Sequence, residues 1–99
     1  MTNIITNAII TAYCACQVCC GHAAKGLTAS GQKPQEGVTV AASRVYPLGS
    51  TLHYNGHTYI IQDRLAKRYD NRVDVYFNSH LKAKQFGIKT NQTLTIITK

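Results

Sequence analysis

Residues 71–77, Asn-Arg-Val-Asp-Val-Tyr-Phe, alternate between apolar and polar side chains. Val73 and Val75 recur with a period of two, which is typical of a half-buried β-strand. Asp74 then lies on the opposite face of that strand, although aspartate is disfavoured in strands. Such a local violation is typical of a functional site, and the alternative is a solvated face on which Asp74 pairs with a cation such as Arg72.

The rest of the chain predicts further short strands separated by turns. Asn55 and Gly56 join two β-prone runs and give the strongest signal for a hairpin. Ser79 is typical of a helix N-cap and Gly87 of a helix end. The expected strands cover residues 4–13 (with a bend around Asn7), 38–42, 51–54, 57–62, 71–77 and 94–98, and the expected helix covers residues 80–86. This pattern predicts a small closed barrel, and without linker or repeat we expect residues 1–99 to be a single domain.

The chain is strongly basic, with 11 Lys and Arg against 4 Asp and Glu and a formal charge of +7. A basic surface attracts polyanions such as nucleic acid, anionic lipid or an acidic cell-wall polymer. The densest cluster is expected either to hold such a polyanion or to keep a loop soluble, and it consists of Arg64, Lys67, Arg68 and Arg72. Nucleic acid is not expected, because only Tyr69 is interleaved with the cluster and no helix-turn-helix or zinc-finger spacing occurs.

No apolar run approaches the roughly 18 residues of a transmembrane helix, so membrane insertion is not expected. The N-terminus also lacks the basic and apolar regions of a signal peptide.

Four cysteines fall within seven residues: Cys14, Cys16, Cys19 and Cys20. Three interpretations stay open, namely at least one local disulfide, a metal site with His22 as a spare ligand, or free thiols. We predict the disulfide, because structural zinc usually takes two separated cysteine pairs and there is no second pair. No metal or other cofactor is expected, and a catalytic thiol would lack a positioned base.

Several short motifs follow one another in the order of a known family. They are, along the chain, Thr11-Ala12-Tyr13, Cys19-Cys20-Gly21, residues 26–31, residues 37–41, Pro47-Leu48-Gly49-Ser50, Asp63, residues 71–77, and His80 with Phe86-Gly87. From about Thr11 to Ile97 the chain resembles the 3D domain, a family named for three aspartates. That family is related to the C-terminal part of membrane-bound lytic transglycosylase A and to the muralytic stationary-phase survival proteins of Gram-positive bacteria. The resemblance implies a mainly β, six-stranded double-psi β-barrel with one short helix.

The resemblance also implies cleavage of peptidoglycan between N-acetylmuramic acid and N-acetylglucosamine without water. The muramic 6-hydroxyl attacks its own C1 and leaves a 1,6-anhydro end, so one carboxylic acid can carry out both proton transfers. Asp74 matches the position of that acid, and Asp63 matches a second family aspartate. The implied partners are peptidoglycan glycan strands at the bacterial cell wall. We expect the protein to be a monomer, and either a phage-type lysin or a trimmed secreted domain.

The family's glycan site implies further residues that bind sugar. Four residues match or neighbour its positions: Tyr13, Thr28, Ser43 and Asn71. We expect them to direct hydrogen-bonding groups at one cleft, with Arg72 as a further sugar-binding residue. Turn and strand-end chemistry is the alternative for Thr28 and Asn71.

The chain departs from the family at two places. Ser43 stands where the family has its first aspartate, and residues 64–68 replace a Gly-Gly loop. Both changes would favour the ionised form of Asp74.

Two other functions stay open. A non-catalytic, expansin-like module would bind wall glycan without cutting it, since fold does not fix chemistry. An inverting hydrolase would need two carboxylates about 6.5–9.5 Å apart, and Asp63 and Asp74 could supply them.

Overall fold

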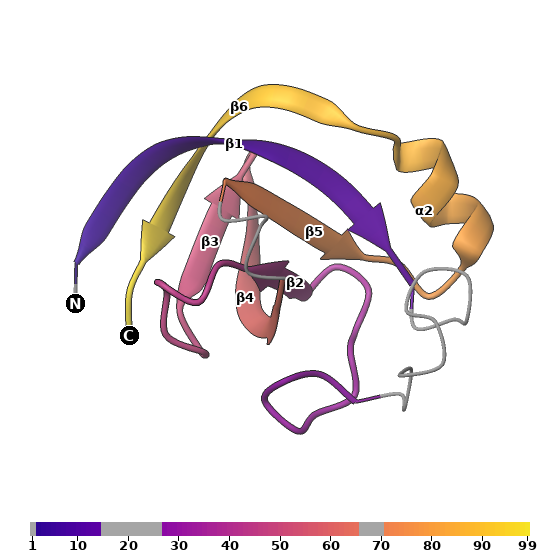
Figure 1. Cartoon of the computed structure of the whole chain (residues 1–99), viewed down its shortest axis with the longest axis horizontal. Coiled ribbons are helices and arrows are strands. Elements are labelled where there is room, and N and C mark those ends of the chain that lie inside the picture. The colour runs from indigo at the N-terminus through magenta and orange to yellow at the C-terminus, as the bar shows by residue number, and fades with distance from the viewer. Residues whose placement is uncertain (1, 15–26, 66–70) are drawn as a thin grey trace.

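Six strands close into a β-barrel in the computed structural model, which describes residues 2–14, 27–65 and 71–99 (Figure 1). The strands are β1 (Asn3–Tyr13), β2 (Thr39–Ala42), β3 (Thr51–Tyr54), β4 (His57–Arg64), β5 (Arg72–Tyr76) and β6 (Lys89–Ile97). Helix α2 (His80–Phe86) connects β5 to β6 and packs beside the end of β1. The fold class expected from the sequence, a mainly β, six-stranded double-psi barrel with one short helix, is confirmed for the described residues.

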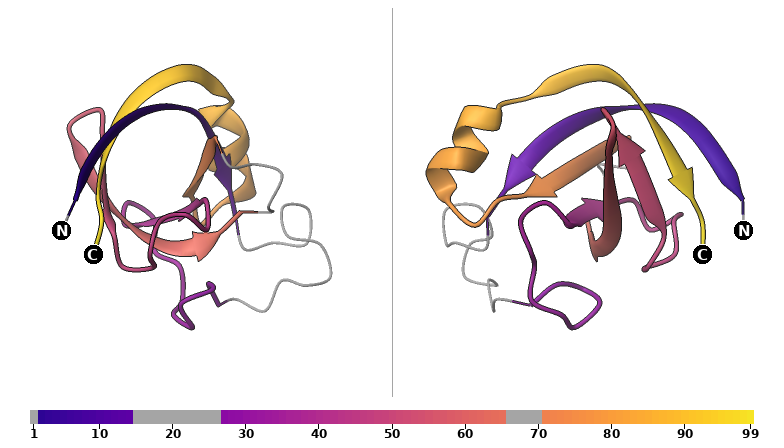
Figure 2. Two further views of the ribbon diagram at one scale, coloured as in Figure 1. Left: turned by 60° about the vertical axis from the view of Figure 1, so that its left-hand side comes forward. Right: turned by 180° about the vertical axis from the view of Figure 1, so that it is seen from behind.

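The strands close in the order β1-β5-β2-β4-β3-β6, and β6 pairs back with β1. Figure 2 shows the resulting ring of ribbon in a view turned by 60° from that of Figure 1, which looks into the ring, and in a view from behind. Two pairings are parallel, β1 with β5 and β2 with β4, so the barrel is not a simple meander. The expected hairpin joins β3 to β4, and Asn55 and Gly56 take φ values of 52° and 76° there. Positive φ at both central residues is what a tight hairpin turn of this hand requires.

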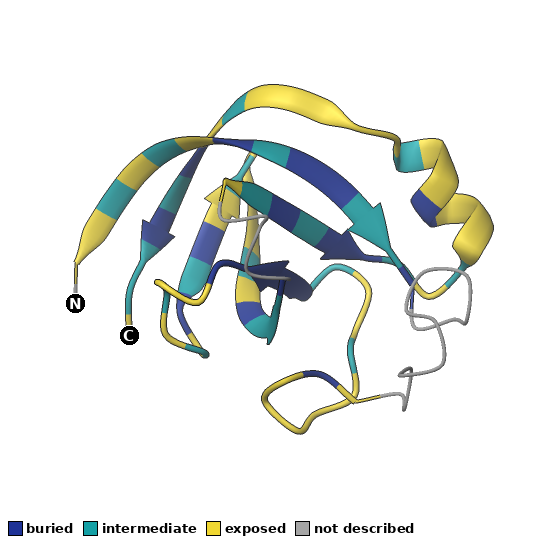
Figure 3. Ribbon diagram, viewed as in Figure 1, coloured by how far each residue is buried: buried dark blue, intermediate teal, exposed yellow. Residues whose placement is uncertain are grey.

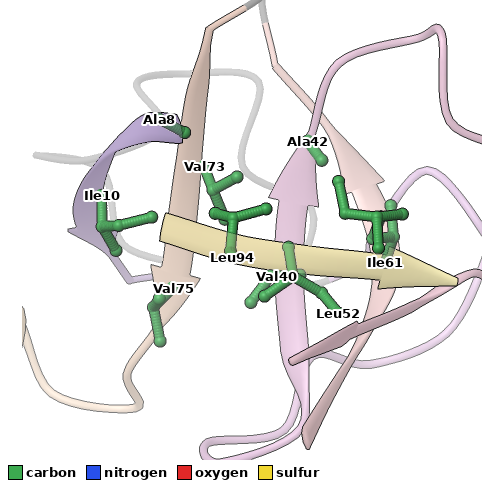
Figure 4. Close-up of a cluster of buried hydrophobic side chains, with 10 residues drawn as sticks. Ala8, Ile10, Val40, Ala42, Leu52, Ile61, Val73, Val75 and Leu94 are labelled. Carbon is green, nitrogen blue, oxygen red and sulfur yellow. The ribbon is translucent and has the colours of Figure 1, made fainter. Parts of the chain in front are cut away.

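Alternating side chains fill the barrel. Figure 3 shows buried and more exposed residues succeeding one another along the strands, as the period of two predicts. The largest fully buried apolar side chains are Ile10, Leu52, Ile61, Leu94, Ile96 and Val40. Val73 and Val75 point into the same cluster, so the opposite face of β5 is left for Asp74 (Figure 4).

The structure differs from the sequence-based boundaries at β6. This strand begins at Lys89, five residues before the expected Leu94, because its polar first half pairs with β1 through contacts such as Gln92 with Ala8. Hydrophobic alternation detects only the half of the strand that lines the core. The expected bend in β1 is a register shift between Ala8 and Ile10, just after Asn7.

Helix α2 begins and ends at the residues that the sequence predicts. The Ser79 side chain accepts a hydrogen bond from the Lys82 amide at 3.4 Å, and Gly87 ends the helix with a φ of 75°. Phe86 packs on Phe77 with ring centroids 5.4 Å apart, which holds the helix against the end of β5. In the described part of the chain, no helix combines the length and the apolar character needed to cross a membrane.

Candidate functional site

Four neighbouring strands place a row of residues at one level of the barrel wall. Thr11 of β1 pairs with Asp74 of β5, Asp74 pairs with Ala41 of β2, and Ala41 pairs with Asp63 of β4. Directly paired residues project from the same face of a sheet, so Asp74 and Asp63 share the outer face. Ala41 carries only a methyl group, so no large side chain of β2 stands between the two carboxylates.

A bulge in β4 turns Asp63 toward that outer face. Val40 pairs with Ile61, yet the next residue of β2, Ala41, pairs with Asp63, so Gln62 is an extra residue in the ladder. Without the bulge, strict alternation would direct Asp63 to the same face as the core residue Ile61. Bulges are frequent next to functional sites because they re-aim a side chain in this way.

The described residues hold Asp63 in place by three hydrogen bonds. Its Oδ1 accepts from the main-chain amides of Ala29 at 3.0 Å and Arg64 at 2.9 Å. Its Oδ2 accepts from the Tyr13 hydroxyl at 3.2 Å. Tyr13 is itself packed edge-on against Tyr76, with ring centroids 5.5 Å apart. The two oxygens of Asp63 are thus used for positioning the 27–30 segment and Tyr13.

Asp74 lies in an open groove of about 480 Å³. Strands β1 and β5 form one wall, and the end of α2 with the residues that follow it forms the other. The described lining residues are Thr11, Ala12, Tyr13, Arg72, Asp74, Ala83, Lys84, Gly87 and Ile88. The buried Thr11 hydroxyl donates a hydrogen bond to Oδ1 of Asp74, which orients the carboxyl group in the groove.

Partial burial raises the pKa of Asp74 above the ordinary value of an aspartate. The neighbouring charge of Asp63 raises this pKa further, whereas the Thr11 hydrogen bond and the charge of Arg72 lower it. Desolvation is the largest of these influences, because an ionised carboxylate loses water that the groove only partly replaces. The carboxyl group of Asp74 is therefore more readily protonated than that of an exposed aspartate.

We expect the Asp74→Asn variant to be more stable than the wild type at pH 7. The pKa of Asp74 is higher in the folded than in the unfolded chain, so protonation of Asp74 stabilises the folded state. This stabilisation is fully present below the pKa of the unfolded chain and is lost as pH rises through the pKa of the folded chain. Asparagine is neutral throughout and its amide oxygen can still accept from Thr11. The gain should therefore appear at neutral pH and vanish in strong acid, as measured by thermal unfolding at a series of pH values.

Glu36→Gln is the matched control, because it also neutralises one carboxylate. Glu36 pairs with Lys82 at 3.4 Å and accepts from the Asn78 amide at 3.1 Å, so its loss should not stabilise the protein at pH 7. A lower midpoint for Asp74→Asn than for the wild type at pH 7 would contradict the argument.

The structure brings together only part of the predicted sugar-binding set. Tyr13 and Arg72 line the groove with Asp74. Thr28 is buried and shares a hydrogen bond with the Ser30 hydroxyl at 2.8 Å. Ser43 is buried too, and its Oγ accepts from the Val45 amide at 3.3 Å, which is turn chemistry.

Asn71 lies at a different hollow. Together with Arg72, Tyr46 and Thr6 it lines a cavity of about 210 Å³, and its main-chain oxygen accepts from the Ile9 amide at 3.0 Å. Arg72 borders both this cavity and the groove. The described contacts therefore do not direct Tyr13, Thr28, Ser43 and Asn71 at one cleft, because local turns and strand ends use three of them.

Arg64, the first residue of the expected basic loop, belongs to β4. Its Nη1 donates to the main-chain oxygens of Ser43, at 3.1 Å, and of Tyr46. This guanidinium holds the turn after β2, which is a structural use for a residue expected to bind a polyanion. Lys67 and Arg68 lie outside the described residues.

Cys14, at the end of β1, is disulfide-bonded, and His80 Nδ1 lies 3.7 Å from its sulfur. The predicted disulfide is thus confirmed at this cysteine. Cys16, Cys19 and Cys20, with His22, lie outside the described residues. Within the described ranges, no three His, Cys, Asp or Glu side chains gather closely enough to hold a metal ion.

The sequence analysis missed the second wall of the groove. Lys84, Gly87 and Ile88 face the Asp74 side, although they follow Asp74 by ten or more positions. The sequence did contain a usable signal, because Ile88 is a large apolar residue directly after the helix-ending Gly87. In the structure this residue is 68% exposed.

Fold and site together define a class of protein: a small β-barrel that carries a pair of carboxylates and an open groove on its outer face. No family model matches the chain. The chain is similar to the "Putative cell wall shaping protein YabE" of Bacillus subtilis (strain 168), with 37% identity over 91 residues. Those residues are 90% of this chain but 22% of the relative, so the chain spans about a fifth of the length of the curated protein that it matches.

Proposed function

We propose that the protein is a peptidoglycan lytic transglycosylase that acts at the bacterial cell wall. The observation that carries the proposal is Asp74, a carboxyl group of raised pKa that Thr11 orients in an open groove. The similarity to a relative named for cell wall shaping supports a wall glycan as the ligand. The sequence resemblance to the 3D domain supports the same chemistry.

In the proposed reaction, protonated Asp74 gives its proton to the oxygen that links muramic C1 to N-acetylglucosamine. The C1–oxygen bond breaks as the muramic 6-hydroxyl attacks C1. The Asp74 carboxylate then takes the 6-hydroxyl proton, which restores the acid for the next cycle. The products are a free 4-hydroxyl on N-acetylglucosamine and a 1,6-anhydromuramic end, and no water is consumed.

Asp63 has a supporting part in this proposal. Its two oxygens already accept from Ala29, Arg64 and Tyr13, so it is poorly placed to activate a water or attack a sugar. Its charge helps to keep Asp74 protonated. It also holds Tyr13, which lines the groove. One acid with one positioning carboxylate fits a reaction in which the substrate supplies its own nucleophile better than it fits an inverting hydrolase.

A non-catalytic wall-binding module is the second candidate. The observation that favours it is Ser43, which stands at a family aspartate position and is buried in a turn through its contact with Val45. A site with fewer carboxylates than its relatives can retain binding after losing chemistry.

Mass spectrometry of the products released from purified peptidoglycan separates these functions. We expect anhydromuramic ends. Reducing ends would identify a hydrolase, and retention on the wall without any released product would identify a binding module. Either of those two results would overturn the transglycosylase proposal.

We expect Asp63→Asn to move the alkaline limb of the pH–activity profile to lower pH while preserving most of the activity at its optimum. Removal of the Asp63 charge lowers the pKa of Asp74, so the acid loses its proton at a lower pH. The measurement is the rate of anhydro product release across pH.

Tyr13→Phe is the control, because it removes the hydrogen bond to Asp63 without changing any charge. Its alkaline limb should stay where the wild type has it. Equal displacement of the limb in both variants would show that geometry and not charge links Asp63 to Asp74.

A further inference from the structure

One wall of the groove combines an apolar side chain with a cation. Ile88 is 68% exposed and lines the groove directly after α2, and Lys84 lines it from the last turn of the helix. The opposite wall holds Asp74, Thr11 and Arg72. A single exposed apolar residue is ordinary on a protein surface, but one that lines a groove is placed to contact an apolar part of a ligand. The helix side of the groove is thus suited to a group that has both an apolar and an anionic part.

Lys84 differs from the nearest lysine on the same helix. Lys82 forms an ion pair with Glu36 at 3.4 Å. The Lys84 side chain has no ion pair or hydrogen bond to any residue in the described ranges, and it lines the groove. A cation without a partner among the described residues, placed beside a binding groove, attracts an anionic group of the ligand.

We propose that Lys84 and Ile88 recognise the carboxylate-bearing side chain on carbon 3 of muramic acid; this rests on the proposed function of the groove. Carbon 3 belongs to the same sugar ring as C1, the carbon at which Asp74 acts. The side chain on carbon 3 and the reacting C1 therefore fall within one groove. Lys84 binds a carboxylate of that side chain, and Ile88 contacts its lactyl methyl group. The helix side of the groove therefore distinguishes muramic acid from N-acetylglucosamine, which lacks this side chain.

The carboxylate can come from two sources. In strands stripped of peptide by an amidase, the lactyl group itself ends in a carboxylate. In peptide-bearing strands the lactyl carbonyl is an amide, and the carboxylates belong to the stem peptide. The chemistry that Lys84 recognises is the same in both.

Binding is measured with the Asp74→Asn protein, in which Lys84→Gln is compared with Lys82→Gln. Both changes remove one positive charge from the same helix, but only Lys84 lines the groove. The probes are amidase-stripped glycan strands, peptide-bearing strands and chitooligosaccharides. Because binding does not require cleavage, the outcome is independent of whether the wild type proves to be a transglycosylase.

We expect Lys84→Gln to weaken binding of at least one muramic probe by about fivefold, the scale of a solvent-exposed ion pair. The loss should shrink as salt is raised, since screening acts over about 8 Å at physiological ionic strength. Loss on stripped strands assigns the lactyl carboxylate, and loss on peptide-bearing strands assigns the stem peptide. Unchanged binding of both muramic probes, an equal loss on chitooligosaccharides or an equal loss in Lys82→Gln would overturn the proposal.

Discussion

The Asp74→Asn variant is expected to release anhydromuramic products at least ~10²–10⁴-fold more slowly than the wild type, the usual contribution of general acid–base catalysis. The substitution keeps the shape of the side chain and an acceptor for Thr11, but it removes the proton that the leaving oxygen needs. Asp74 is the only carboxyl group among the described lining residues of the groove. The neighbouring Asp63 cannot replace it, because it is held by Ala29, Arg64 and Tyr13. The measurement is the rate of product release from purified peptidoglycan, followed by mass spectrometry.

Two controls make this loss interpretable. The variant should bind glycan as tightly as the wild type and should not be less stable at pH 7, because a desolvated carboxylate has been neutralised. Asp63→Asn, which also removes one charge, should lose much less activity at its own pH optimum. A folded Asp74→Asn protein that still forms anhydro ends at a near wild-type rate would end the assignment of Asp74 as the acid and base.

The second large effect is expected in the core. Ile61→Ala should lower the free energy of unfolding by about 2–5 kcal/mol, because it leaves a cavity in the barrel core, where this β4 residue is 0% exposed. Small domains are stable by only about 5–15 kcal/mol, so a large part of the stability would be lost. The effect is measured by denaturant unfolding, as a shift of the transition midpoint at unchanged slope.

The preceding residue provides a matched control. Ile60 has the same side chain and the same strand, but it lies on the outer face and is 36% exposed. Ile60→Ala should therefore lower the stability much less than Ile61→Ala. Similar losses in the two variants would mean that the alternation along β4 does not separate core from surface.

Local patterns predict most of the fold because each strand carries its own signal. The alternation around Val73 and Val75, the Asn55-Gly56 turn and the Ser79 cap are decided by neighbouring residues, and the structure contains each of them. The first half of β6 gives no such signal. Its polar residues are in a strand only because β1 lies beside them, and that pairing joins the two ends of the sequence.

The candidate site is less predictable for the same reason. The outward direction of Asp74 follows from strand alternation, and its proximity to Asp63 follows from the resemblance alone. The bulge at Gln62 and the contact of Ala29 with Asp63 depend on pairing between distant segments. Thr28 and Ser43 were expected at a cleft from their positions in motifs, but their hydroxyl groups bond to Ser30 and to Val45 in local turns.

The pairing of the first strand with the last sets the order in which the barrel can assemble. Asn3 lies opposite Ile97, and Thr6 opposite Leu94, so the ring stays open until β6 has been synthesised. Up to that moment the nascent chain exposes the edges of β1 and β3 on the ribosome, where unpaired strand edges are open to wrong partners. Contacts between such distant segments also slow the search, and folding in roughly milliseconds to seconds is typical of chains dominated by them. Barrel closure therefore depends on β6 and comes late in the folding of this barrel.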